Sequence, residues 1–552
     1  MSNQRQSHDF SPALPTAITL HAPPNSSIDK YPSKSHAHRL AAQLHVTNGL
    51  VVLAATPAAT YPDSDQPVPF RQDRYFYYLT GCDEPGCYVT YDIGKDVLTL
   101  WLPAIDEKRV VWTGRGSTVE EAVERYDVDE ARYIHGTGAF HSSSAIRLGL
   151  PQYLEAHLRQ CWNRAAGNES CNKNVYVLSP ERVNSIYNPS SPETPLLASA
   201  SRTLEASRTE LKNAINACRT LKDPHEIALI RRANAITAAA HTAVLRNIST
   251  YTNEAQVEAL YTATCIAQHA KQQAYSPIAG AGPNASVLHY GANDEDFGSR
   301  EVLVLDAGCE WHCYASDVTR AIPLNTAHPG EWASAEAAGI YKLVETVQEA
   351  CIAAMEPGAS FLGITYMARR MTVDGLLALG ILKGDKEAIW KAGTVMGFFP
   401  HGLGHHLGLE VHDVSPVAHP PASSLTTCIT TSSPEILPYQ LPRSFNFPLP
   451  TSSSSHSPDP SLLHPGMVIT IEPGIYFNRF LLEHFFLSNP THSPFIDREV
   501  LDRYWRVGGV RIEDDILVTG QGYENLTTAL KGRGMREAIR GGKGGEGGEG
   551  DG

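Results

Sequence analysis

Three short, mainly apolar runs in the second half of the chain each end at an acidic residue. LVLD ends at Asp306, VITIE ends at Glu472, and VRIE ends at Glu513. Such runs are typical of buried β-strands, where an unpaired carboxylate costs several kcal/mol unless it binds a cation or forms a strong pair. Because the same feature recurs in separate segments, we expect a fold that uses these acids together.

The segment LVLDAGCEWHCYASDVTR contains two candidate sets of metal ligands. Cys309, His312 and Cys313 lie between Asp306 and Asp317. A structural zinc site needs four ligands, usually as two pairs, and no second Cys/His pair follows at that spacing. We therefore interpret the two cysteines as small hydrophobic residues at a hairpin and His312 as structural. The two aspartates are the candidate ligands.

A fourth segment, HGLGHHLGLEVHD, places His401, His405 and His412 in a glycine-rich stretch. It lacks the glutamate of an HExxH motif, and its glycines disfavour the helix on which that motif depends. Four carboxylates with one imidazole make a hard, oxygen-rich ligand set. Such a set suits two bridged divalent ions of the Mn²⁺ or Co²⁺ type better than a thiolate zinc site.

The length of 552 residues predicts two or three domains. Asp223, Pro224 and Glu226 form a strong helix start with a capping box, and the boundary lies shortly before it. After it we expect two long helices, a strand hairpin, two or three further helices and further strands. The predicted units are a flexible arm (1–35), a smaller α/β domain (36–210), a larger α+β domain (222–535) and a disordered glycine-rich tail (536–552).

The smaller domain is expected to form around a mixed sheet, because short apolar runs alternate with helical patterns. These runs lie at 49–57, 73–81, 87–103 and 172–180. In the larger domain, residues 416–460 contain 25 Ser, Thr or Pro among 45 and only three charged residues. This stretch cannot bury enough surface to order itself. A disordered insert and translated non-coding sequence are both compatible with its composition.

The composition excludes several classes of protein. A net charge of −14 disfavours nucleic-acid binding, which depends on clustered Lys and Arg. No apolar run approaches the ~18–20 residues of a membrane span, and the N-terminus lacks the apolar region of a signal peptide. Ten cysteines without a CxxC pair indicate reduced thiols and a cytoplasmic location.

Four motifs, in this order, resemble the M24B group of peptidases, the Xaa-Pro aminopeptidases and prolidases. They are LDAGCEWHCYASDVTR, HGLGHHLGLEVHD, ITIEPGIYF and GGVRIEDDI, and PFRQDRYFYYLTGCDEPG extends the resemblance into the smaller domain. The resemblance implies an α+β catalytic domain of the pita-bread fold, preceded by a smaller α/β domain. It also implies a centre of two divalent ions, with Mn²⁺ expected and Co²⁺ or Zn²⁺ as alternatives.

Carried over residue by residue, the resemblance assigns roles to particular side chains. Asp317 and Glu513 would bridge the two ions, while Asp306 would bind one of them. The other ion would be held by His405 and Glu472. Further residues would act around this centre: Thr319 would orient an acid, His289 would bind substrate, His412 would stabilise the tetrahedral intermediate, Glu472 would move a proton, and His401 and Arg511 would line the pocket. His406 is expected to point elsewhere.

The resemblance also implies hydrolysis of the bond between an N-terminal residue and a penultimate proline, by a hydroxide that bridges the two metals. The substrates would be proline-containing peptides, with the α-amino group near Asp306, and the enzyme would be a homodimer. A strict Xaa-Pro dipeptidase uses the same ligands and remains an alternative. A non-catalytic pita-bread binding module is a more remote one, since such modules have usually lost ligands.

Overall fold

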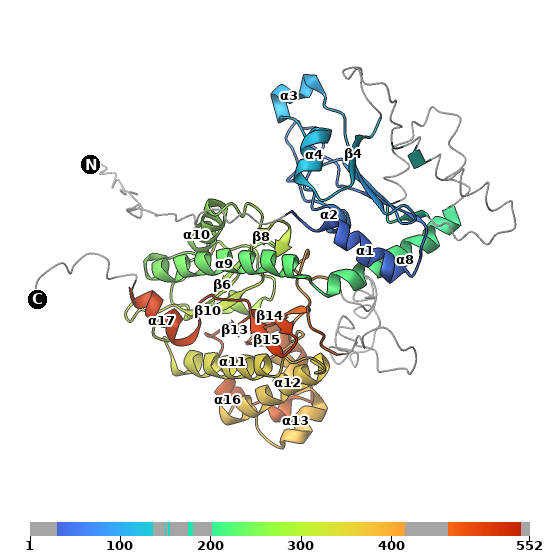
Figure 1. Cartoon of the computed structure of the whole chain (residues 1–552). Helices are drawn as coiled ribbons and strands as arrows, with labels where there is room; N and C mark the ends of the chain where they lie inside the picture. The colour runs from blue at the N-terminus through green and yellow to red at the C-terminus, as the bar shows by residue number, and fades with distance from the viewer. Residues whose placement is uncertain are drawn as a thin grey trace, which may run out of the picture.

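The computed structural model describes residues 30–135, 150, 153–154, 175–179, 201–414 and 462–541. Most of the predicted arm, the predicted insert and the end of the predicted tail lie outside these residues. The described helices and strands form a smaller N-terminal unit and a larger C-terminal unit (Figure 1). The chain passes from the first to the second at the end of the long helix α8 (Ser201–Thr220).

The N-terminal unit contains the expected mixed sheet. Its five strands have the order β4-β3-β2-β1-β5. Strand β1 pairs antiparallel with β2 and parallel with β5, and β3 pairs parallel with β4. The strands are β1 (Leu50–Ala54), β2 (Tyr88–Asp92), β3 (Val97–Leu102), β4 (Glu130–Tyr133) and β5 (Val175–Val177).

One apolar run of this unit is a helix and not a strand. Residues 73–81 contain α2 (Arg74–Thr80), because the Asp73 side chain accepts hydrogen bonds from the backbone N–H groups of Tyr75 and Phe76. Gly81 ends the helix at a φ of 61°, which favours glycine. The other helices here are α1 (Ser33–Leu44), α3 (Glu107–Thr113), α4 (Val119–Arg125) and α8 (Ser201–Thr220).

Helix α8 crosses the expected domain boundary. It packs against α1 and β5, so the N-terminal unit continues to Thr220 and not only to residue 210. The next helix, α9 (Pro224–Asn247), starts where the sequence indicates. Asp223 and Glu226 make the reciprocal hydrogen bonds of a capping box, each at 2.9 Å.

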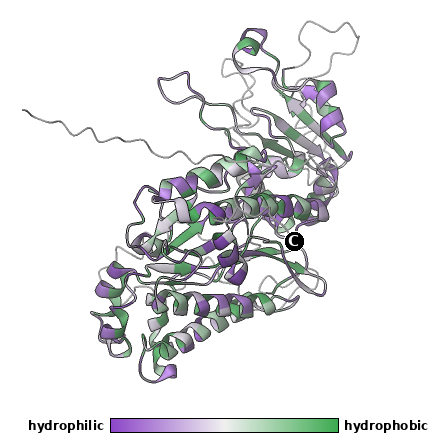
Figure 2. Cartoon of the chain, turned by 90° about the vertical axis from the view of Figure 1, so that its left-hand side faces the viewer, coloured by the Kyte–Doolittle hydropathy of each residue, from purple (hydrophilic) through white to green (hydrophobic). Residues whose placement is uncertain are grey.

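The C-terminal unit places strands between two groups of helices. In Figure 1, α9 lies on one side of the strands and α11 on the other. The helices are α9, α10 (Glu254–Ala267), α11 (Ala335–Ala353), α12 (Phe361–Ala378) and α13 (Lys386–Ala392), followed by the short α15 (Arg479–Leu481) and α16 (Arg498–Leu501). In Figure 2 these helices mix hydrophilic and hydrophobic residues, as expected of helices with one face on a core and one towards solvent.

The strands of this unit form two three-stranded sheets, β10-β7-β6 and β11-β14-β15, and two short pairs, β12-β13 and β8-β9. Their bounds are β6 (Ile278–Ala281), β7 (Val302–Asp306), β8 (Glu310–Trp311), β9 (Tyr314–Ala315), β10 (Thr319–Pro323), β11 (Val468–Ile471), β12 (Gly474–Tyr476), β13 (Gly509–Arg511), β14 (Asp514–Thr519) and β15 (Gly522–Asn525). The hairpin expected between the two aspartates is therefore confirmed.

The tail was expected from residue 536, yet α17 (Gly532–Gly541) continues into it. Met535 and Ile539 lie four residues apart, on one face of the helix, and are buried where α17 packs on α9. The two apolar side chains therefore order a segment whose composition indicates disorder. Among the described helices, none has the length and apolar character needed to cross a membrane.

Candidate metal centre

Strand register brings the acids of separate segments to one place. Asp306, the last residue of β7, is paired with Thr319, the first residue of β10. Thr319 also forms a bridge with Glu513, which immediately precedes β14. In the other sheet, Ile471 is paired with Asp514, so the residue that follows β11 lies beside Glu513. The acids that end the apolar runs of the sequence are therefore neighbours in the fold.

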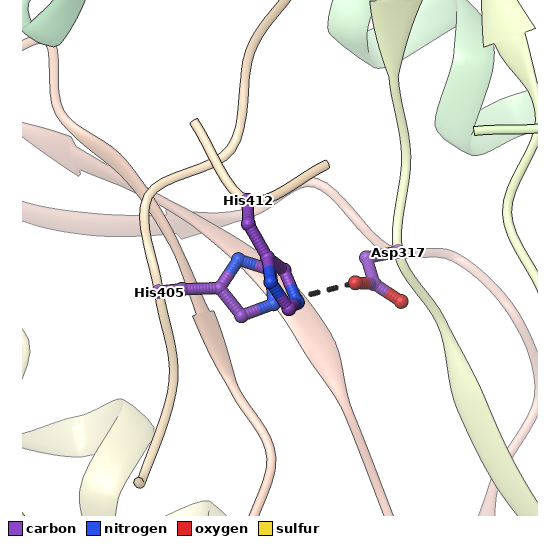
Figure 3. A group of neighbouring side chains, drawn as sticks. All are labelled: Asp317, His405 and His412. Carbon is purple, nitrogen blue, oxygen red and sulfur yellow. Dashed lines mark ion pairs between the residues drawn. The ribbon is translucent and has the colours of Figure 1, made fainter. Parts of the chain in front are cut away.

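His405 lies among the remaining acids. Its Nε2 atom is 3.4 Å from Asp317 Oδ2, 3.5 Å from Glu472 Oε1 and 3.9 Å from Glu513 Oε1. Figure 3 shows the His405 ring turned towards Asp317, with the ring of His412 next to it. The loop that carries these histidines is fixed on the sheet, since the His405 carbonyl accepts a hydrogen bond from the Thr470 N–H at 2.9 Å.

All five predicted ligands fall into groups whose donor atoms lie within 4.8 Å of one another. One group is Asp306, Asp317 and Glu513, and another is His405, Glu472 and Glu513. A third joins Asp317 to His405 and His412. Asp317, Glu513 and His405 each occur in two of these groups, so the groups overlap in one continuous cluster.

The electrostatics of the cluster fit divalent cations. In the absence of a cation, burial and neighbouring carboxylates raise the pKa of Asp317, raise that of Glu513 well above its usual value and raise that of Glu472 to about 7. Burial opposes protonation of His405, but Asp317 and Glu472 outweigh it and raise the His405 pKa to about 9. The excess negative charge and the oxygen-rich donor set together match hard divalent ions.

Arg511 and Tyr275 hold the first acid of the cluster. Arg511 Nη2 lies 2.5 Å from Asp306 Oδ2, and the Tyr275 hydroxyl lies 2.5 Å from both Asp306 Oδ1 and Asp317 Oδ1. A phenol has a single proton, so Tyr275 donates to one carboxylate at a time. Arg511 is thus a buried partner of a candidate ligand, while its expected place along the pocket stays a prediction. The role of Tyr275 was not predicted from the sequence.

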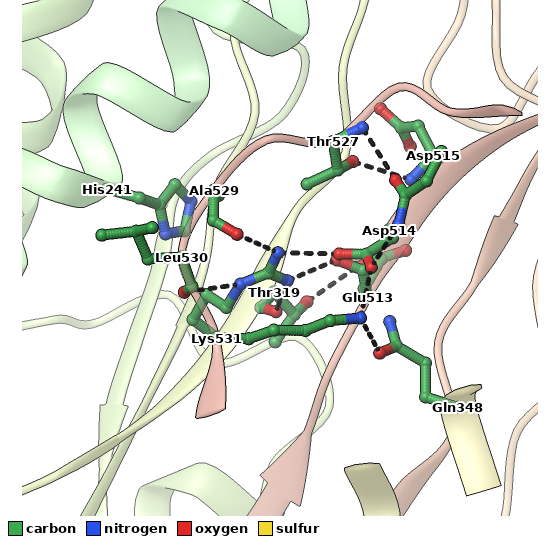
Figure 4. Close-up of polar contacts among 12 residues, drawn as sticks. His241, Thr319, Gln348, Glu513, Asp514, Asp515, Thr527, Ala529, Leu530 and Lys531 are labelled. Atoms are coloured by element: carbon green, nitrogen blue, oxygen red, sulfur yellow. Dashed lines mark hydrogen bonds and ion pairs between the residues drawn. The ribbon is translucent and has the colours of Figure 1, made fainter. Parts of the chain in front are cut away.

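The three consecutive acids at 513–515 have different hydrogen-bond and ion-pair partners (Figure 4). Glu513 Oε2 accepts a hydrogen bond from Thr319 Oγ1 at 2.7 Å, as expected for a residue that orients an acid. Asp514 forms an ion pair with Lys531 at 2.7 Å. Asp515 Oδ2 accepts a hydrogen bond from the Asp317 N–H at 3.1 Å. Only Glu513 belongs to the ligand groups found among the described residues.

His401 lies at the edge of the cluster. Its Nε2 atom is 2.8 Å from the Tyr476 hydroxyl, and its Nδ1 atom is 3.7 Å from Glu472 Oε2. Burial, assisted by the charge of Arg511, lowers the His401 pKa to about 3. The neutral ring can therefore hydrogen-bond to Tyr476, which also accepts from Arg511 at 2.7 Å. Tyr476 was not singled out from the sequence.

His412 and His289 are the exposed histidines near the centre. The rings of His412 and His405 have centroids 4.1 Å apart. The charge of His405, followed by burial and the charge of His289, lowers the His412 pKa to about 3. His289 lies in the turn after the short 3₁₀ helix Gly282–Ser286. Both side chains can therefore meet a ligand that enters from solvent.

The structure gives Cys309, His312 and Cys313, the other candidate metal ligands of this segment, places in a turn and in hydrophobic clusters. His312 and Cys313 form the tight turn between β8 and β9 at φ angles of 47° and 64°, and His312 is exposed. Cys309 and Cys313 are buried in hydrophobic clusters. His406, next to the candidate ligand, is buried, and its backbone pairs with Ile469. The cysteines therefore pack as small hydrophobic residues.

Two family models match the chain. The model of metallopeptidase family M24 matches residues 228–520, and the model of the aminopeptidase P N-terminal domain matches residues 34–144. The matches correspond to the two structural units and extend over most of the described chain.

Relatives match along nearly the whole chain. A probable Xaa-Pro aminopeptidase of Pyrenophora tritici-repentis is 48% identical over 95% of this chain and 74% of its own length. A probable Xaa-Pro aminopeptidase of Aspergillus clavatus is 43% identical over 95% of this chain and 96% of its own. A low-pH form of Escherichia coli aminopeptidase P has a TM-score of 0.65 at 25% identity and covers 94% of this chain and 100% of its own. The match confirms the fold predicted for both units.

Proposed function

The chain belongs to metallopeptidase family M24, and we propose that it is an Xaa-Pro aminopeptidase. The observation that carries the proposal is the convergence of Asp306, Asp317, His405, Glu472 and Glu513 at one site, in which the two aspartates and Glu513 are buried. A binding module that had lost its activity would have no need of five intact ligands. The relatives named as probable Xaa-Pro aminopeptidases support the same activity.

The family implies divalent metal ions, and we propose two per chain, with Mn²⁺ as the native metal. Asp306 would hold one ion and His405 with Glu472 the other, while Asp317 and Glu513 would contact both. A pair of bound cations lowers the pKa of water towards neutrality and polarises a peptide carbonyl. Arg511, Thr319 and Tyr275 hold these ligands in place through the hydrogen bonds described above.

The remaining residues act on the peptide. His412 and His289 are exposed beside the cluster and would hydrogen-bond to the carbonyl oxygen as it gains charge. Glu472 would accept the proton of the attacking water and deliver it to the leaving imide nitrogen.

Proline explains why a dedicated site is useful. An Xaa-Pro bond has no N–H to donate, and the ring fixes φ, so general peptidases bind it poorly. The acids of the cluster would attract the free α-amino group of the peptide. This attraction would restrict cleavage to the first residue.

We also propose a cytoplasmic homodimer. The cysteines that the structure describes are buried and unpaired, which supports a reducing compartment. Val111 and Trp112 on α3 are 87% and 85% exposed, an unusual exposure for adjacent large apolar residues. A second copy could cover them.

The test compares peptides of two lengths. The protein, reconstituted with Mn²⁺, is incubated with Gly-Pro and with Arg-Pro-Pro, and free amino acids are quantified. An aminopeptidase releases arginine from the tripeptide. Cleavage of Gly-Pro alone would identify a strict dipeptidase. No turnover of either peptide by protein with two bound ions would refute the catalytic proposal.

A further inference from the structure

Two of the segments that carry candidate metal ligands also carry an acid that faces away from the centre. Glu310 lies in β8, within the hairpin between Asp306 and Asp317, and its carboxylate is buried. Glu410 lies in the loop between His405 and His412. Neither acid belongs to the ligand groups found among the described residues. Each is instead paired with the N-terminal unit.

Two arginines of the N-terminal unit bind these acids. Arg71 donates through Nη1 to Glu310 Oε1 at 3.0 Å and through Nη2 to Glu410 Oε2. Arg74 donates to Glu310 Oε1 at 2.5 Å, and its Nε atom lies 3.6 Å from Glu410 Oε1. Each guanidinium therefore contacts the hairpin of the aspartates and the loop of the histidines at once.

The arginines are held on a rigid segment. Gln72, between them, donates to the carbonyls of Cys82 and Glu84 and accepts from the N–H groups of Thr56 and Asp73. Arg74 is the first residue of α2, which Asp73 caps. Because Gln72 is fixed inside the N-terminal unit, the side chains on either side of it have a defined position against the C-terminal unit.

The histidine loop has a further anchor next to His412. Asp413 Oδ1 accepts from Arg219 Nη2 at 2.6 Å, and Asp413 Oδ2 lies 3.1 Å from Lys222 Nζ. Arg219 belongs to α8, and its guanidinium lies 5.0 Å from the ring centroid of Tyr75 in α2. Helix α2 and the residues before it are thus connected to both sides of His412.

We infer that Arg71 and Arg74 are positioning residues of the metal centre, which set the spacing between the aspartate hairpin and the histidine loop from the N-terminal unit. The inference rests on the proposed function, because it assigns these residues to the same centre. The planar fork of arginine can bind two carboxylates in a fixed geometry, which the point charge of lysine cannot do. Without the bridge, His405 and Asp317 keep their chemistry but lose a constraint on their separation.

The test measures Mn²⁺ affinity of the full-length protein by calorimetry, without substrate. The variants are Arg71→Ala, Glu410→Gln and the double variant. The matched control is Arg231→Ala, since Arg231 pairs with Glu524 at 2.7 Å and both side chains are about as exposed as those of Arg71 and Glu410. Unfolding temperatures of the chelated proteins show whether each variant is folded.

We expect each single variant to bind Mn²⁺ about 10-fold more weakly, the usual effect of losing a partner that orients ligands. The loss in the double variant should be smaller than the sum of the two single losses, because both changes remove the same Arg71–Glu410 pair. The kcat for Arg-Pro-Pro should fall with KM unchanged, and Arg71→Lys should not restore the affinity. The control should match the wild type.

Unchanged Mn²⁺ affinity in folded Arg71→Ala and Glu410→Gln would overturn the inference, as would losses that add in the double variant. A lower unfolding temperature with unchanged affinity would assign the bridge to stability alone. Because affinity is measured without peptide, a wild-type protein that fails to cleave Xaa-Pro bonds would refute the proposed function without deciding this inference.

Discussion

Arg511 and Asp306 form a buried ion pair at 2.5 Å beside the candidate metal centre. The pair joins β13 to the end of β7, and it uses one oxygen of Asp306 while the other faces Tyr275. A ligand that is fixed through one oxygen can present the other to a cation in a constant direction. Arg511 therefore connects strand β13, which lies just before Glu513 in the chain, with the carboxylate of Asp306.

Replacing Arg511 by Met should impair the centre more than the fold of the N-terminal unit. The Asp306 carboxylate would lose its partner and rotate, so kcat for an Xaa-Pro peptide should fall about 10- to 100-fold. Steady-state kinetics and Mn²⁺ titration check the prediction. A variant with wild-type kcat would show that Asp306 needs no such support.

Removal of the hydroxyl of Thr319 should have a smaller, specific effect. Thr319 donates to Glu513 at 2.7 Å and accepts from Arg511 Nε at 3.2 Å. Thr319→Val keeps the shape but leaves these groups unpaired, and we expect about a 10-fold loss of metal affinity. Thr319→Ser retains the hydroxyl and is the matched control. Equal affinities of the two variants would argue against an orienting role.

Glu513 should be indispensable, because it is the carboxylate shared by the group of Asp306 and Asp317 and the group of His405 and Glu472. We expect Glu513→Ala to bind fewer than two Mn²⁺ ions and to show no detectable turnover. Metal content after dialysis, measured together with peptide hydrolysis, gives both quantities. Glu524→Gln, at an exposed ion pair of β15, should retain both. Retained turnover by Glu513→Ala would contradict the bridging role.

The ion pairs of Asp413 predict a pH-dependent stability. Burial opposes ionisation of Asp413, but Arg219 and Lys222 outweigh it and lower the Asp413 pKa from its usual value. A lowered pKa means that the folded state holds the charged form more strongly than the unfolded state does. The stabilisation is therefore complete above the unfolded pKa and is lost as the pH falls through the folded value.

Asp413→Asn should accordingly lower the free energy of unfolding by about 3–5 kcal/mol at pH 7, as expected when a buried pair loses one partner. The difference from the wild type should shrink as the pH falls below about 4. Urea denaturation over a pH series measures it. A difference that stays constant down to pH 3 would assign the loss to packing instead of charge.

The sequence was informative where a local pattern determines the structure. Asp306, Glu472 and Glu513 could be singled out as candidate ligands because each ends a mainly apolar run. The Asp223 capping box correctly marks the start of α9. Tyr275 could not be found, since it follows no strand or motif and reaches the cluster only through tertiary packing. Tyr476 lies within a recognised motif, but its contacts with His401 and Arg511 come from segments remote in the chain.

The errors have similar causes. Residues 73–81 have the apolar content of a strand, but the cap at Asp73 and the glycine at 81 determine a helix. The composition ends the N-terminal domain at residue 210, but helix α8 continues without a break to Thr220. The pairing of Arg71 with Glu310 and Glu410 depends on how the two units are packed together, and no pattern along the chain encodes it.

The most direct test of the proposed two-metal centre measures the number of bound Mn²⁺ ions and peptide turnover in the same titration. The protein is stripped with a chelator and then titrated with Mn²⁺, while bound metal and release of arginine from Arg-Pro-Pro are followed together. We predict no release from the stripped protein and full recovery as two ions bind per chain. Full turnover after complete chelation, or two bound ions without release of arginine, would contradict the account.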